Sequence, residues 1–525
     1  MANKSLFQSL IGMLIPRTDA TNEEGAPAYA LSPKHALAQY AATGCLNMTF
    51  YATAENQLET VLDLCTKVDG EFVARTAVFS RERAYLKDMP ALLTAVLAGL
   101  DGKLLATVFP RTIDNGKMLR NFVQIIRSGA TGRKSLGTLP KRLVRQWLEA
   151  RDDESVFEAS VGQSPSLADI IKMTHPKPGN DARRALYGYL LGRAHERAAL
   201  PEKIRDYEAF RSDPTGAVPD VPFQMLTDLP LTTDAWRAIA RNAPWHATRM
   251  NLNTFARHGA FDGVEGRALT RLVADRLKDR NQIQRSRVFP YQLMVAHSAA
   301  CETVPGEVRE ALQDAMETAI DNVPTIKGTV FVCPDVSGSM TAPLTGHRKG
   351  ATSVIRCVDV AALMAAAIAR KNPGTTILPF EHRVVGLRLN PRDSVVTNAA
   401  KLASVGGGGT SVSAPLALLN QQRAIGDLVV FISDNESWVD AHGARGTELL
   451  RQWSVFRQRN PTARLVLIDL QPNRTTQALD REDILNVGGF SDQVFDLVAS
   501  FARGEVGGDH WVGEIEKIEL ARNGQ

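Results

Sequence analysis

Apolar and polar residues recur through residues 1–320 with the period of amphipathic helices, and runs typical of strands are scarce there. No strict repeat is visible, but irregular helix pairs stack into repeats while tolerating divergent sequence. We therefore expect an all-helical first part, built as an irregular solenoid of helix pairs, with a compact helical bundle as the alternative. The helix-length segments include residues 89–100, 117–127, 141–150, 181–200 and 266–278.

The pattern changes near Val323 and Pro324, after which short apolar runs typical of strands alternate with amphipathic segments typical of helices. Such alternation predicts an α/β domain with a mostly parallel, doubly wound sheet, whose ligands bind beyond the carboxyl ends of the strands. The chain is thus expected to divide into a helical domain, residues 1–323, and an α/β domain, residues 324–525. Strands are expected over residues 329–333, 375–380, 428–433 and 463–470, and helices over 354–370, after the glycine-rich loop, over 448–459 and over 491–503.

Hard oxygen side chains stand at the ends of two predicted strands and in a glycine-rich loop of the α/β domain. They are Asp335, Ser337 and Ser339 in TVFVCPDVSGSM, Thr410 in GGGGTS, and Asp434 in LVVFISDNES. Carboxylate and hydroxyl oxygens suit Mg²⁺, Ca²⁺ or Mn²⁺ rather than zinc. The first motif alone is equally explained by a polar turn after a strand. The three segments together predict a site for Mg²⁺ or another divalent cation.

Composition narrows the class of protein. With 525 residues, of which 44% are apolar, the chain is long enough for two or more globular domains. Five widely spaced cysteines without a Cys-x-x-Cys motif favour buried thiols in a reducing compartment, and hence a cytoplasmic protein. No run of roughly 18 apolar residues is present to span a membrane. The apolar run of residues 6–15 is interpreted as a mature amphipathic segment.

Positive charge is clustered, although the net charge is only +4. Stacked helices would join such clusters into a stripe that neutralises phosphates, and solvated helix faces are the alternative. Trp147, Trp236 and Trp245 lie nearby and are candidates either for base stacking or for the core. The clusters are Lys117, Arg120, Arg127, Arg133, Lys134, Lys141, Arg142 and Arg145; then Lys172, His175, Lys177, Arg183 and Arg184; then Arg237, Arg241, His246, Arg249, Arg257 and His258.

Two sets of motifs resemble known families. Asp-x-Ser-x-Ser, then Gly-Gly-Thr, then a strand-terminal Asp resembles the metal-ion-dependent adhesion site of von Willebrand factor type A domains. The segments GRKSLGTLPKRLVRQWLEA (132–150) and DIIKMTHPKP (169–178) resemble the TROVE domain of the Ro autoantigen family. NVGGFSDQVFDLVASF (486–501) resembles the von Willebrand domain of the same family. The chain is therefore identified as a member of the Ro autoantigen family, of the bacterial type.

This resemblance implies a HEAT-like helical-repeat ring followed by a von Willebrand domain, in a monomeric protein that is not an enzyme. It implies an RNA-binding scaffold that binds small noncoding Y RNA and the single-stranded 3′ ends of misfolded or structured RNA, supporting RNA quality control, processing or decay. In bacterial members the Y RNA tethers polynucleotide phosphorylase, and a bound Mg²⁺ leaves one position for a partner's carboxylate. The candidate RNA contacts are Arg133, Lys134, Lys141, Arg142, Arg145, His175, Lys177 and Arg249.

Two other functions are compatible with the sequence. A metal-dependent protein-adhesion module that works with an AAA-type ATPase would bind protein through its helical part and show no salt-sensitive RNA affinity. A metal-dependent nuclease would need several clustered carboxylates, and the motifs supply only Asp335 and Asp434. The chain has no GxxxxGK[ST] motif, so we expect no nucleotide hydrolysis by that route.

Overall fold

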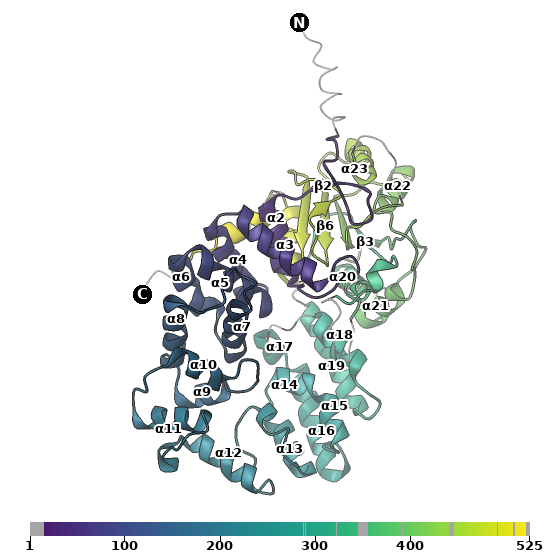
Figure 1. Ribbon diagram of the computed structural model, residues 1–525. Coiled ribbons are helices and arrows are strands. Elements are labelled where there is room, and N and C mark those ends of the chain that lie inside the picture. Colours follow the sequence, from purple (N-terminus) through teal and green to yellow (C-terminus); the bar gives the residue numbers. More distant parts are fainter. Residues whose placement is uncertain are drawn as a thin grey trace. The chain divides into compact units, whose positions relative to one another are not determined.

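The computed structural model describes residues 15–520 except 287, 289, 322, 345–354, 391, 440–445, 491, 508 and 509 (Figure 1). The chain forms two compact units. The sheet unit comprises Met1–Val68, Val288–Val295 and Met316–Lys517, and the helical unit comprises Asp69–Arg287, Ala296–Ala315 and Ile518–Gln525. This division differs from a single boundary after residue 323, because the segment that ends at Val68 belongs with the sheet.

A five-stranded parallel sheet lies at the centre of the sheet unit, in the order β4-β3-β5-β6-β8. Its strands are β3 (Val330–Pro334), β4 (Thr376–Ile377), β5 (Leu428–Ser433), β6 (Arg464–Asp469) and β8 (Ile484–Gly488). In the register of the central strands, Pro334 lies opposite Ile432, and Ser433 lies opposite Asp469. Because the strands are parallel, their carboxyl ends meet at one edge of the sheet.

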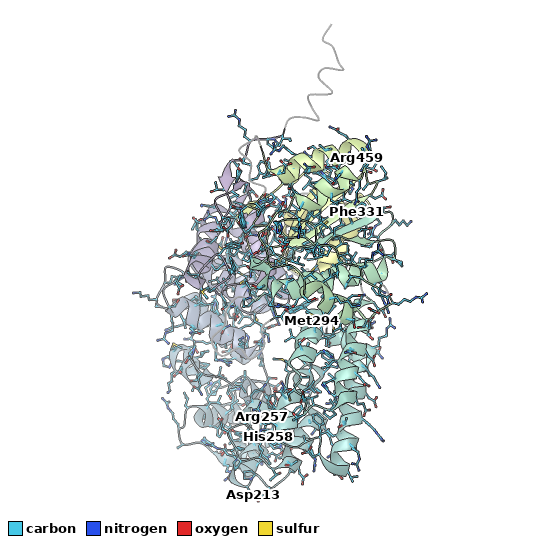
Figure 2. The ribbon with its side chains drawn as sticks, turned by 90° about the vertical axis from the view of Figure 1, so that its right-hand side faces the viewer. Asp213, Arg257, His258, Met294, Phe331 and Arg459 are labelled. Carbon is cyan, nitrogen blue, oxygen red and sulfur yellow. The ribbon has the colours of Figure 1, made fainter. Side chains whose placement is uncertain are left out.

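Helices cover both faces of this sheet, as expected for strands that are apolar along their whole length. The helices are α20 (Cys357–Lys371), α21 (Val395–Ala403), α22 (Ala414–Gln421), α23 (Glu448–Arg459), α24 (Asp492–Ala502) and α25 (His510–Glu516). Phe331, Val429 and Leu465 share a buried cluster with Trp453 and Phe456 of α23. Figure 2 labels Phe331. On the opposite face α20 packs against β3, β4 and β5, and α24 packs against β6 and β8.

Residues 20–67, which precede the helical unit in the sequence, pack onto the sheet. They form β1 (Ala20–Thr21), β2 (Pro27–Ala30), α2 (Pro33–Thr43) and α3 (Ala54–Lys67). Tyr29 of β2 pairs with Thr476 of β7 (Thr475–Thr476) in an antiparallel ladder. Gln39 of α2 donates from Nε2 to Asp469 at 2.7 Å, and α2 contacts β8. In Figure 1 the purple helix α2 accordingly lies beside the yellow strands.

Short amphipathic helices build the helical unit, and side chains of the sequence cap many of their amino termini. Asp69 and Asn115 accept from the third backbone N–H of their helices, and Ser166 and Asp169 form a reciprocal capping box. The helices are α4 (Gly70–Glu82), α5 (Asp88–Leu100), α6 (Gly102–Thr112), α7 (Gly116–Arg127), α8 (Thr138–Glu149), α9 (Asp153–Glu158), α10 (Leu167–Thr174), α11 (Asp181–Leu190), α12 (Glu202–Ser212), α13 (Thr233–Asn242), α14 (Trp245–Met250), α15 (Leu252–Arg257), α16 (Gly263–Lys278) and α17 (Arg280–Ser286). Two further helices, α18 (Pro290–Ala299) and α19 (Gly306–Ile320), contribute residues to both units.

The predicted fold class, a helical part followed by an α/β domain with a parallel sheet, is confirmed. Three details are corrected. The helix predicted over 181–200 ends at Leu190, because Gly192 adopts a φ of +64° and turns the chain. The strand predicted over 375–380 is reduced to the two residues of β4. The strand β8 was not predicted, because Asn486 interrupts its apolar pattern. The buried Asn486 side chain forms hydrogen bonds with Thr476 and Ala478.

Two other expectations concern the amino-terminal segment and the tryptophans. The apolar segment of residues 6–15 lies outside the described residues except for Ile15. Trp147, Trp236 and Trp245 are core residues with at most 6% of their surface exposed, so they are not base-stacking platforms. Among the described residues, no helix is long and apolar enough to cross a membrane.

Candidate functional site

The register of β3 and β5 brings two of the predicted metal ligands together. Asp335 directly follows β3, and its backbone N–H donates to the Ile432 carbonyl at 2.9 Å. Its Oδ2 accepts from the Ser433 hydroxyl at 2.6 Å, and Asp434 is the next residue along the chain. Two carboxylates separated by almost one hundred residues in sequence thus meet because their strands are neighbours in a parallel sheet.

The turn after Asp335 presents the two serines of the motif. The Ser337 N–H donates to Asp335 Oδ1 at 2.8 Å, which closes an Asx-type turn, and the Ser337 and Ser339 hydroxyl oxygens lie 3.3 Å apart. Ser339 also lies beside Asp434. Carboxylate and hydroxyl oxygens of four predicted residues therefore face one another.

The glycine-rich loop places Thr410 beside this turn through backbone contacts. The Gly338 N–H donates to the Gly408 carbonyl at 2.9 Å, and the Gly407 N–H donates to the Val336 carbonyl at 2.8 Å. At Gly406, where φ is +90°, a Cβ would lie 2.2 Å from the Val336 carbonyl oxygen, so only glycine allows this approach. We call Asp335, Ser337, Ser339, Thr410 and Asp434 the metal edge.

The metal edge is buried and acidic. Its five residues expose at most 7% of their surface. Burial raises the pKa of Asp335 to about 6, and burial together with the neighbouring Asp335 raises the pKa of Asp434 to about 7. Asp434 Oδ2 is buried without a hydrogen-bond partner among the described residues. An orphaned carboxylate oxygen amid hydroxyls fits a hard divalent cation, which would supply the missing positive charge.

The structure also brings side chains to this edge that the sequence patterns did not indicate. Glu436 is 1% exposed, and burial together with Asp434 raises its pKa to about 9. Tyr51, from the amino-terminal segment, lies beside Ser339. The position of Glu436, two residues after Asp434, could have indicated it from the sequence. Tyr51 had no such signal, because nearly three hundred residues separate it from Ser339.

Six basic side chains lie on or beside α8 and α10, and we call them the basic surface. Arg142, Lys134, Lys172, His175 and Lys177 are exposed and Lys141 is half-buried, and none of the six makes a salt bridge with a described residue. Arg145 of α8 donates from Nε to the Thr174 carbonyl at 2.5 Å, which fixes the end of α10 against α8. Because His175 follows Thr174, the two groups of predicted contacts lie on neighbouring helices of one unit.

His175 caps α10 in the left-handed conformation, with a φ of 50°. This region disfavours most side chains other than glycine and asparagine, although histidine is enriched in it several-fold. Pro176 follows and cannot continue the helix. The imidazole is consequently held in an exposed position beside Lys177.

Several other predicted cations have structural partners. Arg133 donates to the Ala98 carbonyl, and Arg183 pairs with Asp153 and also donates to two carbonyls, Leu148 and Arg151. Arg184 pairs with Asp181 at 2.5 Å. Arg133 and Arg183 therefore stabilise the helical unit and are less available to phosphates than the basic surface, whereas the Arg184 pair is exposed to solvent. Arg133 and Arg145 nevertheless remain half-exposed.

Two arginines of the cluster in residues 235–261 also pair with acids. Arg237 pairs with Asp234 at 2.8 Å, and Arg241 pairs with Glu265 at 2.9 Å. Arg249 is half-buried at the end of α14. Arg257 and His258 follow one another at the end of α15 (Figure 2), and the His258 ring stacks on Trp236 with ring centres 4.3 Å apart. Both acids, Asp234 and Glu265, lie outside residues 235–261, so the sequence of the cluster alone does not include them.

Comparison with known proteins shows what these features are similar to. Residues 329–502 match the family model described as the Ro60 vWA domain. The α/β part of the chain is therefore similar to the von Willebrand domain of Ro proteins. The chain is 25% identical to the RNA-binding protein RO60 of Deinococcus radiodurans, over 96% of this chain and 100% of that protein. It also resembles the crystal structure of the Deinococcus radiodurans RO (RSR) protein, with a TM-score of 0.63 and 23% identity over 90% of this chain and 100% of that one. The likeness predicted from the motifs is thereby confirmed.

Proposed function

We propose that this chain is an RNA-binding scaffold of the Ro type, whose basic surface contacts phosphates. The observation that carries the proposal is the set of six cations on and beside α8 and α10 that make no salt bridge with a described residue. Each such cation gains more from a phosphate than an arginine already paired with a carboxylate. The relative named as an RNA-binding protein supports the same function.

The finer proposal concerns which RNA binds. We infer small noncoding Y RNA as one ligand, and misfolded or structured RNA with single-stranded 3′ ends as the other. In this proposal the helical part is a HEAT-like ring that belongs to residues 1–323, and the bound Y RNA recruits polynucleotide phosphorylase to a monomeric, cytoplasmic, non-enzymatic protein. The family resemblance supports these assignments.

A filter-binding titration tests the RNA proposal. The wild-type chain is titrated with a hairpin RNA that carries a 3′ single-stranded tail and with the same hairpin blunt-ended, from 50 to 200 mM salt. We expect the logarithm of affinity to fall linearly with the logarithm of salt concentration, because phosphate contacts release counterions. The tailed RNA should bind more tightly. Equal affinities for the two RNAs would contradict the binding of a single-stranded 3′ end. Salt-independent binding would contradict the basic surface as the RNA contact.

A paired variant locates the contact. Replacing Lys141 and Arg142 by alanine should cost about 1 to 3 kcal/mol of binding free energy and reduce the salt slope by about 1 to 2. Arg184→Ala is the control, because this exposed arginine of α11 is already paired with Asp181. Equal losses in the two variants would contradict the assignment.

We also propose that the metal edge binds Mg²⁺. Asp335 and Asp434 would supply the charge, and Ser337, Ser339 and Thr410 the hydroxyl oxygens. When bound, the cation would act as a Lewis acid for one further oxygen ligand, because neutral hydroxyls leave it electron-poor. The buried Asp434 oxygen without a hydrogen-bond partner favours this occupancy. A metal-dependent protein-adhesion module is therefore the second candidate function, and uptake of Mn²⁺ measured by calorimetry on the full chain tests it.

A further inference from the structure

The amino-terminal segment covers the metal edge within the sheet unit. Asn22 donates from Nδ2 to the Ser437 carbonyl at 2.7 Å, and the Glu23 N–H donates to the Glu436 carboxylate at 3.0 Å. Both acceptors lie in the loop that follows Asp434. The segment therefore binds the same loop that carries one metal ligand, and it explains why the edge is almost fully buried.

Tyr51 of this segment lies beside a predicted ligand. Its hydroxyl lies next to the Ser339 side chain, and Asp434 is a further neighbour. The hydroxyl therefore stands next to two of the five residues of the metal edge.

A fixed turn presents Tyr51. The Thr49 N–H donates to the Ala52 carbonyl at 2.9 Å, and the Ala52 N–H donates back to the Thr49 hydroxyl oxygen at 3.2 Å. Gln57 of α3, which is 1% exposed, donates from Nε2 to the same hydroxyl oxygen at 3.3 Å. The turn is thus tied to a buried side chain, which fixes the position of Tyr51 beside Ser339.

We propose that the Tyr51 hydroxyl closes the coordination position that a partner's carboxylate would otherwise take. This inference rests on the proposed Mg²⁺ site and deepens it: the chain supplies its own cap. A small carboxylate then reaches the cation only when Tyr51 withdraws, and a protein partner must displace the turn at residues 49–52. The intramolecular hydroxyl has an advantage of effective concentration over any free ligand.

The test compares the full wild-type chain with Tyr51→Phe, using Mn²⁺ as the metal and acetate as the carboxylate probe. Proton relaxation enhancement reports the water molecules on bound Mn²⁺, and calorimetry reports metal affinity. We expect Tyr51→Phe to gain relaxivity equal to one coordinated water, because phenylalanine keeps the ring but lacks the oxygen. We expect acetate to bind the loaded variant about tenfold or more tightly than the loaded wild type, because its competitor is gone.

Tyr40→Phe is the matched control. Tyr40 lies in α2 of the same segment, and its hydroxyl lies next to Thr60, which is not a metal ligand. This variant loses one tyrosine hydroxyl from the segment and should match the wild type in relaxivity and acetate binding.

The outcomes separate the cap from the metal site itself. If Mn²⁺ binds both wild type and Tyr51→Phe with equal relaxivity and equal acetate affinity, the cap is wrong and the metal site stands. If neither protein takes up Mn²⁺, the metal site fails and the cap fails with it. A gain of relaxivity in Tyr40→Phe as large as in Tyr51→Phe would show loosening of the segment, and would also overturn the cap.

Discussion

The metal edge and the basic surface hold their polar side chains in opposite ways. At the metal edge, backbone hydrogen bonds between three chain segments fix the carboxylates and hydroxyls, and exposure does not exceed 7%. On the basic surface, one bond from Arg145 to the Thr174 carbonyl joins the two helices, and five of the six cations extend into solvent. The fold thus brings distant segments together at the metal edge, whereas on the basic surface it only positions two neighbouring helices.

This difference determines how each region responds to change. In a buried site every polar atom needs a partner, so the loss of one ligand removes the function of the whole site. On an exposed surface each cation contributes a similar and separable share, screened by salt. Removal of one group should therefore abolish metal binding but only weaken RNA binding.

The largest expected effect comes from the metal edge. Asp335→Ala should abolish Mn²⁺ uptake in calorimetry on the full chain, because the buried residue supplies charge and anchors both Ser337 and Ser433. Glu482→Gln is the control, since Glu482 is an exposed carboxylate outside the site. Undiminished uptake by the Asp335 variant would place the metal elsewhere.

Acid should weaken metal binding strongly. The pKa values of Asp335 and Asp434 are about 6 and about 7, and the cation needs both carboxylates deprotonated. Lowering the pH from 8 to 5 should therefore reduce Mn²⁺ affinity on the order of a hundredfold to a thousandfold. A flat calorimetric profile across this range would exclude these two groups as ligands.

The same shifts predict how the metal-free protein responds to pH. Because both pKa values lie above the ordinary 3.8, the folded state binds more protons than the unfolded state in this window. Stability is then fully present at low pH and is lost as the pH rises from about 4 through about 7. Thermal melting with and without Mg²⁺ should show the cation restoring stability at the upper end. Metal-free stability that rises over this window would contradict the shifts.

Arg142 and Arg145, both on α8, test the same contrast between an exposed cation and one fixed by the fold. Arg142→Ala should reduce the salt slope of RNA binding by about 1 with little change in melting temperature. Arg145→Ala should lower the free energy of unfolding by about 1 to 2 kcal/mol, because the half-buried guanidinium donates to the Thr174 carbonyl. Denaturant unfolding and filter binding on both variants separate the roles. Equal stability losses would mean that both arginines are structural.

The smallest expected effect is coupling between the two regions. They lie in different compact units. Asp335→Ala should thus leave RNA affinity within about 0.5 kcal/mol of the wild-type value. A larger loss in a folded variant, measured by filter binding, would show that metal and RNA are linked.

From the sequence we predicted the helical part, the parallel sheet and the five candidate ligands of the metal edge, and the structure confirms the first two. The sequence allowed these predictions because strand ends and glycine-rich turns are local signals, and parallel strands bring their carboxyl ends to one edge. It also indicated where positive charge concentrates in residues 115–148.

Tertiary structure alone decided which charges stay available and what covers the metal edge. Arg183 and Arg241 look like Lys141 and Arg142 in the sequence, but acids from other helices pair with the first two. Tyr51 reaches Ser339 only because the amino-terminal segment packs onto the sheet. Both outcomes depend on contacts between residues far apart in the chain, which no local pattern records.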